Sequence, residues 1–194
     1  MDNKNLILIV SLVVVVFLAG GFVLMQNQKM AGMQEKSGRL ILDNPIVEIT
    51  EGGQTSSYQY SNGSISADCC TEDWQVVRLF AITAAGQVKP CMFTHPRADG
   101  IVALTYKNIK LKKTISFTTA IADAVVTGNN ASVYMDVYVN NTLLQRITQT
   151  DAKGWFATDI KTDQYENKLA DVKLVVSSDN VASRWFCWDA QTVE

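Results

Sequence analysis

The sequence predicts an all-β domain, either a sandwich or a barrel, preceded by a single N-terminal transmembrane helix. Residues 6–25 form an apolar run without a charged side chain, and about eight short segments rich in β-branched and aromatic residues follow it. The clearest segment, Ser132 to Asn140, alternates Val or Met with Tyr or Asp, which is the period of a half-buried strand. A hydrophobic content of 47% with three Pro excludes a disordered or collagen-like chain, and a net charge of −2 is unlike that of a nucleic-acid-binding protein.

The apolar run is long enough to cross a membrane. At ~1.5 Å of helix rise per residue it spans the ~30 Å hydrocarbon core of a bilayer. A cleaved signal peptide is the alternative, but the apolar regions of signal peptides are typically ~7–15 residues long. We therefore expect an uncleaved signal-anchor. The predicted organisation is 1–36 (transmembrane anchor and helical extension), 37–64 (extended segment and linker) and 65–194 (β-sandwich domain).

The signals for the orientation of this anchor disagree. Lys29, Lys36 and Arg39 after the apolar run outnumber Lys4 before it, and the positive-inside rule would keep the β domain in the cytoplasm. Four cysteines and three Asn-x-Ser/Thr sequons favour an oxidising compartment instead. We expect a single-pass membrane protein whose β domain is extracytoplasmic, at a cell surface or in a virion membrane.

The predicted strands follow one another with short turns between them. Asn44-Pro45 interrupts an extended stretch at 39–50, and the Gly- and Ser-rich residues 51–64 are typical of a linker or a surface loop. Asn140-Asn141 is a candidate hairpin turn, because Asn tolerates left-handed backbone angles. Short helical turns are expected only at 68–73 and 163–169. Strands are expected at 76–83, 101–106, 115–122, 132–140, 143–149, 172–176 and 184–189.

The last predicted strand divides its side chains between two faces. Arg184, Phe186 and Trp188 share one face, while Trp185 and Cys187 share the other. A cysteine on the Trp185 face suggests that this face is the inner one. Trp188 and Arg184 are then expected to be exposed or covered by a neighbouring strand.

From Cys91 onward, the order of motifs resembles that of galactose-binding-like jelly rolls, in particular the carbohydrate-binding modules attached to many glycosidases. Thr94-His95-Pro96 precedes an extended segment, the alternating strand at 132–140 lies in the middle, and residues 184–190 close the domain. The usual Gly-Ile before Thr-His is Met92-Phe93 here, and the usual Asp-Gly hairpin is Asn140-Asn141. The resemblance runs from about Cys91 to Ala190 and implies a jelly-roll β-sandwich.

The resemblance also implies a ligand site, because ligands of this fold usually meet loops at one end of the sandwich. Arg and Asp side chains offer directional hydrogen bonds to vicinal hydroxyls, and an exposed Trp ring offers a stacking face for a sugar. In the alternative interpretation, the histidine ring bonds to backbone at a strand end, the Trp belongs to the core and the arginines are solvated. The candidate ligand-binding residues are His95, Arg97, Asp99, Trp155 and Arg184.

The four cysteines are disulfide candidates. A jelly roll brings its first and last strands side by side, so Cys187 is expected to pair with Cys69, Cys70 or Cys91, and a second bridge to Cys91 is the further expectation. A zinc cluster of all four is the alternative. No other cofactor is expected except structural calcium, which related jelly rolls often hold through carboxylate oxygens; the candidate ligands are Asp68, Asp73 and Asp189.

Two functions from different classes fit these features. The first is a membrane-anchored, non-catalytic module that binds glycan or another surface ligand. The second is a structural protein of a filament, envelope or virion shell, whose β head makes protein contacts only. An enzyme is the least favoured class, because the chain has one histidine, no nucleophile elbow and no recognisable pair of catalytic carboxylates. The expected partners are a membrane with a glycan or a surface protein, and the oligomeric state stays open.

Overall fold

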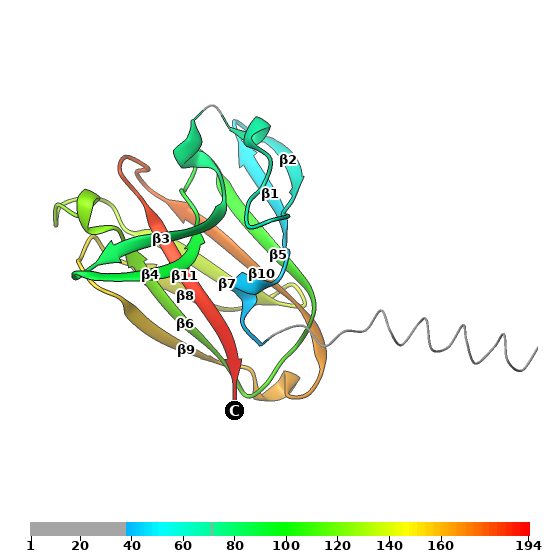
Figure 1. Cartoon of the computed structure of the whole chain (residues 1–194). Coiled ribbons are helices and arrows are strands. Elements are labelled where there is room, and N and C mark those ends of the chain that lie inside the picture. The colour runs from blue at the N-terminus through cyan, green and yellow to red at the C-terminus, as the bar shows by residue number, and fades with distance from the viewer. Residues whose placement is uncertain (1–37, 71) are drawn as a thin grey trace, which may run out of the picture. The chain divides into compact units, whose positions relative to one another are not determined.

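Two antiparallel β-sheets pack face to face in the part of the chain that the computed structural model describes, residues 38–70 and 72–194 (Figure 1). The predicted anchor at 6–25 lies outside the described residues. Within the described residues, no helix is long and apolar enough to cross a bilayer. These described residues belong to one compact unit of the chain.

All pairings between neighbouring strands are antiparallel, and successive strands often switch from one sheet to the other, as in a jelly roll. In spatial order, the six-stranded sheet contains β2 (Gln54–Gln59), β1 (Ile46–Glu51), β5 (Ile101–Lys110), β10 (Leu169–Ser178), β7 (Val133–Val139) and β8 (Thr142–Gln149). The five-stranded sheet contains β3 (Arg78–Ala84), β4 (Gln87–Phe93), β11 (Phe186–Val193), β6 (Thr114–Ile121) and β9 (Phe156–Lys161).

Short 3-10 turns occupy some of the connections. The sequence analysis predicts those at η2 (Ala67–Cys69) and η5 (Asp163–Tyr165), whereas η3 (Asp73–Gln75) overlaps the predicted turn at 68–73 only at its first residue. It does not predict η1 (Leu40–Leu42) or η4 (Asp123–Val125). Both of these lie in segments that also contain β-branched or leucine residues, whose pattern favours an extended chain.

The alternating pattern of β7 is confirmed. Val133, Met135, Val137 and Val139 are fully buried, while the residues between them are partly exposed. Asn140 and Asn141 form the predicted hairpin turn to β8, with φ values of 48° and 66°. The left-handed backbone at both positions explains why the turn contains two asparagines.

The segment 37–64 contains part of its predicted extended stretch as a strand, but residues predicted as a linker or surface loop form a second strand. It contributes β1 and β2, which pair with each other, and β1 also pairs with β5. Val47 and Ile49 of β1 face the core. Gly52 and Gly53 have φ values of 57° and 78°, so they form the tight turn of a hairpin. The Gly-rich composition therefore indicates a turn here rather than a linker.

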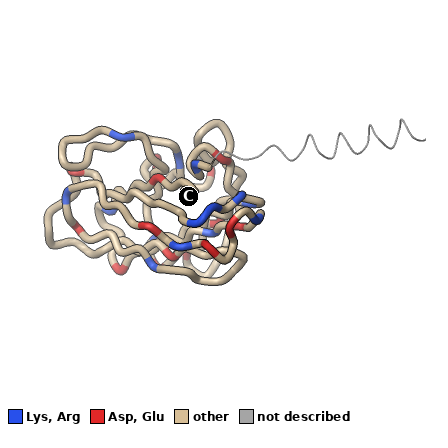
Figure 2. Tube along the Cα trace, turned by 90° about the horizontal axis from the view of Figure 1, so that it is seen from below, with Lys and Arg blue, Asp and Glu red and all other residues tan. Residues whose placement is uncertain are grey.

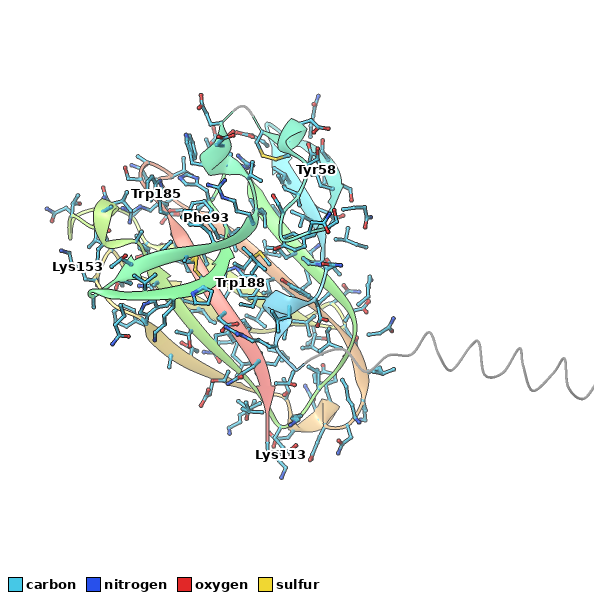
Figure 3. All side chains as sticks on the ribbon, in the orientation of Figure 1. Tyr58, Phe93, Lys113, Lys153, Trp185 and Trp188 are labelled. Atoms are coloured by element: carbon cyan, nitrogen blue, oxygen red, sulfur yellow. A yellow bond between two sulfur atoms is a disulfide. The ribbon has the colours of Figure 1, made fainter. Side chains whose placement is uncertain are left out.

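The last strand places Phe186 and Trp188 on one face and Cys187 on the other, as predicted, but the predicted inner face is wrong. Trp188 is fully buried in the main core, where its ring meets Tyr106 edge-on and its Nε1 donates to Thr94 Oγ1 at 3.2 Å. Trp185, which precedes β11, is 37% exposed instead (Figure 3). Cys187 lies on the opposite side of β11 from Trp188 and is buried as well, because a second apolar cluster covers that face. A buried cysteine therefore does not identify the inner face in this sheet.

A disulfide joins Cys91 on β4 to Cys187 on β11, with 5.6 Å between the Cα atoms. This bond confirms the predicted bridge to Cys187. The expected second bridge to Cys91 is wrong, because Cys69 and Cys70 pair with each other as adjacent residues. With all four sulfurs in disulfides, the cysteines cannot form the alternative zinc cluster.

Candidate ligand site at one end of the sandwich

Arg184 is buried beneath loops instead of lying in an exposed patch. Its guanidinium donates to the backbone oxygens of Ala131 and Ala182, at 3.0 and 3.1 Å, and to Asp151 Oδ1 at 2.9 Å. Its side chain is 0% exposed and that of Asp151 is 3% exposed. Arg184 therefore links the loop segments of Ala131 and Asp151 to its own, and a ligand cannot contact it in this conformation.

Trp155 lies over the second apolar cluster on the five-stranded sheet. Its Nε1 donates to Gln87 O at 3.2 Å, and Lys89 Nζ lies 5.3 Å from the centre of its ring. Asp99 is exposed in the β4–β5 loop and has a φ of 50°. Neither residue has a contact in common with His95 or Arg97 among the interactions of the described residues, so a role for them in ligand binding stays a prediction.

His95 is packed below Trp74, a residue that the sequence analysis does not select. The two ring centroids are 4.4 Å apart at an interplanar angle of 61°. Nδ1 of His95 lies 2.7 Å from Pro96 O, as the strand-end interpretation expects. Burial, together with the smaller effects of the Arg97 and Arg184 charges, outweighs the hydrogen bond to Pro96 and lowers the pKa of His95 to about 4. The ring is therefore neutral at physiological pH.

Arg97 ties the β4–β5 loop to the segment that contains η2 and η3. Its Nη2 donates to Gln75 O at 2.8 Å and contacts Cys70 Sγ at 3.1 Å. The guanidinium is buried, and burial lowers its pKa against the raising effect of Glu51 and Tyr58. Its Nε has no hydrogen-bond partner in the described part of the chain. From its buried position, Arg97 therefore holds the β4–β5 loop against the segment that contains η2 and η3.

Gly100 fixes this same loop against the β1–β2 hairpin. A Cβ atom built on Gly100 would lie 1.9 Å from Thr50 O, a distance at which no side chain fits. The loop between β4 and β5 thus lies directly against the end of β1. In Figure 1 the β1–β2 turn and the short teal helices of the 67–75 segment lie together at the upper end of the sandwich.

These contacts define one candidate site, which we call the loop-end cluster: Cys69, Cys70, Trp74, His95 and Arg97. Its exposed member is Trp74, which is 39% exposed and stands on the buried His95. The structure therefore brings together His95 and Arg97 of the five predicted residues, and adds Trp74. The available signal was the position of Trp74 between the polar residues Asp73 and Gln75, since a core tryptophan is usually flanked by other core positions.

A second candidate is a charged depression of about 320 Å³ on the outer face of the six-stranded sheet. Lys107 Nζ pairs with Asp171 Oδ2 at 2.7 Å, and Lys173 Nζ lies 3.5 Å from Glu48 Oε2. Because these charges already neutralise one another, a ligand would have to break their ion pairs. Figure 2 shows the same mixture of basic and acidic residues along the described part of the chain. The depression is lined by Ile46, Glu48, Thr105, Lys107, Asn141, Asp171 and Lys173.

A third candidate is an apolar groove of about 480 Å³ at the β3 edge of the five-stranded sheet. Its large exposed apolar side chains are Leu42, Leu79 and Phe80. Such a surface has few groups that could hydrogen-bond to a polar ligand and is suited to contact with another apolar surface. The groove is lined by Arg39, Ile41, Leu42, Leu79, Phe80, Ala81 and Pro90.

The carboxylates predicted to bind calcium are not brought together. Asp189 pairs with Arg39, whose Nη2 lies 2.6 Å from Asp189 Oδ2. Asp68 instead accepts a hydrogen bond from Ser66, and Asp73 lies in η3. Residues 38–70 and 72–194 contain no group of three or more His, Cys, Asp or Glu side chains placed to hold a metal ion. The expected calcium ligands therefore do not form a site.

The solved structures that resemble this chain include carbohydrate-binding modules; no protein-family model and no curated protein matches it. The CBM51 module from Clostridium perfringens GH95, in complex with methyl-galactose, is 15% identical with a TM-score of 0.39, and the match covers 59% of this chain and 77% of the module. The ZmpB structure of the same organism, with an M60 catalytic domain and two CBM51 domains, is 13% identical with a TM-score of 0.45; the match covers 83% of this chain but only 19% of that one. CBM36 in complex with calcium and xylotriose is 15% identical with a TM-score of 0.30, over 59% of this chain and 87% of the module.

Proposed function

We propose that the protein is a non-catalytic module that binds glycan through the loop-end cluster, with Trp74 as the stacking residue. The observation that carries this proposal is the exposed ring of Trp74, held on the buried His95 at 4.4 Å between centroids. An aromatic ring in a fixed orientation loses little conformational freedom when the apolar C–H face of a sugar packs on it. The carboxylate of Asp73, which is next to it in the chain and exposed, offers hydrogen bonds to hydroxyl groups.

The neighbours of Trp74 support binding rather than chemistry. His95 is neutral, buried and bonded to Pro96 O, so it lacks access to a substrate proton. Arg97 holds backbone and sulfur atoms below the surface. General acid–base catalysis requires a titrating group within hydrogen-bond reach of the substrate, which neither side chain provides. We propose for the same reason that the module has no enzymatic activity at this site.

The proposed function includes anchorage by the apolar residues 6–25 and an extracytoplasmic location of the β domain. The uncharged run is long enough for a bilayer, and the Cys91–Cys187 disulfide is favoured in an oxidising compartment. In that location the loop-end cluster could meet glycans on a surface.

A glycan-array screen of the full-length chain, followed by titration of the best glycan, tests the binding site. Trp74→Ala is expected to weaken binding by about tenfold or more, which corresponds to about 1.4 kcal/mol, and Trp74→Phe is expected to restore part of it. Trp185→Ala is the matched control, because Trp185 has nearly the same exposed fraction, 37%, outside the loop-end cluster. Far-UV circular dichroism verifies that each variant is folded.

Other outcomes of the same titration would overturn the assignment. Unchanged binding by a folded Trp74→Ala variant excludes the loop-end cluster. Loss of binding by Trp155→Ala alone, in a folded protein, would move the site to the Trp155 surface. Equal losses in Trp74→Ala and Trp185→Ala would show that removal of any exposed tryptophan has the same effect.

The apolar groove favours one alternative function, that of a structural protein whose β head contacts other proteins. Leu42, Leu79 and Phe80 are exposed apolar side chains of one groove, which is the kind of surface that such contacts bury. Sedimentation of the full-length chain in detergent, with Leu42→Asp as the variant, separates the two functions. Self-association that Leu42→Asp abolishes, together with no binding on the glycan array, would favour the structural role.

A further inference from the structure

The two disulfides of the protein lie in opposite environments. Cys91 and Cys187 are fully buried, 96 positions apart, and cross-link β4 to β11. Cys69 and Cys70 are adjacent in the chain and partly exposed. A bridge between distant residues restricts the unfolded chain strongly, whereas a bridge between neighbours restricts it little. The Cys69–Cys70 bond therefore contributes little to holding the sandwich together.

A buried cation contacts one sulfur of the exposed pair. Nη2 of Arg97 lies 3.1 Å from Cys70 Sγ, and its only hydrogen bond to an oxygen among the described residues is the one to Gln75 O. A disulfide sulfur is neutral and gains little from a guanidinium. A thiolate at the same place gains a full charge–charge interaction, as thiolates beside arginine generally do. The arrangement thus suits the reduced state of Cys70 better than the oxidised state.

We infer that Cys69–Cys70 is a thiol–disulfide exchange site that reacts with dithiols and releases Cys70 as the leaving thiolate. A thiolate of the dithiol attacks Cys69 Sγ, the Cys69–Cys70 bond breaks, and its electron pair remains on Cys70 Sγ beside Arg97. The second thiol of the reagent loses its proton and attacks the sulfur of its own molecule in the mixed disulfide. The products are a cyclic disulfide and the protein dithiol, with two electrons and two protons transferred to the protein.

The choice of sulfur follows from leaving-group chemistry. The rate of exchange rises as the pKa of the departing thiol falls, and the departing sulfur near Arg97 is that of Cys70. The same guanidinium also holds Gln75 O, next in sequence to Trp74. Reduction therefore changes the surroundings of Arg97. Among the described contacts, Arg97 is the only cation that links the β4–β5 loop to the 67–75 segment.

The test is exchange on the folded full-length chain, with sites identified by alkylation and mass spectrometry. Limited dithiothreitol is expected to expose Cys69 and Cys70 to alkylation while Cys91 and Cys187 stay protected. With glutathione, a monothiol, the trapped mixed disulfide is expected on Cys69. Arg97→Met is expected to slow reduction by about tenfold and to spread glutathione over both cysteines, while Arg97→Lys keeps the preference for Cys69.

The controls make each outcome decisive. Arg146→Met removes an exposed arginine of β8 that pairs with Asp136, and it is expected to leave the reduction rate unchanged. Protection of Cys91 and Cys187 reports that a variant is folded. If Cys91 and Cys187 are not protected in Arg97→Met, that variant is unfolded. The inference is then tested by which cysteine carries glutathione in the wild-type chain and in Arg97→Lys. Attachment to Cys70, free thiols at Cys69 and Cys70 before reduction, or reduction no faster than at Cys91–Cys187 overturns the inference. None of these readouts involves a glycan, so the inference can fail without the proposed function failing.

Discussion

Removal of Arg184 is expected to destabilise the sandwich strongly, although the residue lies in a loop. The Arg184→Met variant leaves Asp151 buried without its counter-ion, since the two side chains are 0% and 3% exposed and 2.9 Å apart. Breaking a buried ion pair from one side costs about 3–5 kcal/mol of unfolding free energy. The backbone oxygens of Val125, Ala131 and Ala182 lose a donor as well.

The pH dependence of stability gives a second magnitude for the same pair. Burial raises the pKa of Asp151, but hydrogen bonds from Asn130, Arg184 and Thr127 outweigh burial and lower it to about 2, from 3.8. A carboxyl whose pKa is lower in the folded state stabilises the protein fully above pH 3.8, and the contribution disappears as the pH falls through 2. The difference corresponds to about 2 kcal/mol. In Arg184→Met, the part of the unfolding free energy that is lost at acid pH is expected to be smaller.

Urea unfolding at pH 7 and between pH 4 and 2, followed by circular dichroism, measures both effects. Arg146→Met is the matched control, because its partner Asp136 is on the surface of the sheet and the Arg146 side chain is 55% exposed. Exposed pairs contribute about 1 kcal/mol or less. Equal, small losses in Arg184→Met and Arg146→Met would refute the assignment of Arg184 as a buried clamp, and would return it to the candidate ligand residues.

Four further predictions concern other parts of the chain. Stability is expected to fall by about 3 kcal/mol between pH 6.5 and 4, because the unfolded state binds a proton on His95 that the folded state excludes; the pH-dependent unfolding of His95→Gln is expected to lack this part. Gly100→Ala is expected to lower the free energy of unfolding in urea by at least about 2 kcal/mol, because its Cβ would collide with Thr50 O. In the control Gly52→Ala, the new Cβ meets no atom within 4 Å, and the loss is only the backbone strain of about 1 kcal/mol. The double variant Cys91→Ala/Cys187→Ala is expected to lose about 2–5 kcal/mol, and an unchanged melting temperature would contradict the stabilising role of this bridge. Mass spectrometry of protein extracted from membranes is expected to find residues 6–25 intact, and mature chains that begin near Gly21 or Gln26 would contradict the anchor.

Local patterns predict most strands of this protein but miss β2, β4 and β9. The alternation in β7 and the Asn140-Asn141 turn follow from side-chain period and backbone preference, which are properties of neighbouring residues. Local patterns do not predict which face of β11 holds Trp188, because apolar clusters cover both faces of the five-stranded sheet. The sequence could indicate a short Gly turn at 52–53, but only the pairing of β1 with β5 shows that the hairpin belongs to the sheet.

The candidate site is predictable only in part for the same reason. The sequence analysis selects His95 and Arg97 by residue type, and both lie in the loop-end cluster. Their burial depends on Trp74 and Cys70, which are more than 20 positions earlier in the chain. Arg184 likewise is removed from the surface by Asp151, 33 positions away. Residue chemistry thus identifies candidate ligand groups, while the packing of loops decides which of them a ligand can touch.

A crystal structure of the protein with the glycan selected on the array tests the central proposal most directly. The glycan is expected to stack on Trp74 at the loop end, with its hydroxyl groups within hydrogen-bond distance of neighbouring polar atoms of the 67–75 segment. A glycan bound in the charged depression beside Lys107 and Asp171, or stacked on Trp155 with the ring of Trp74 uncovered, would contradict the proposal.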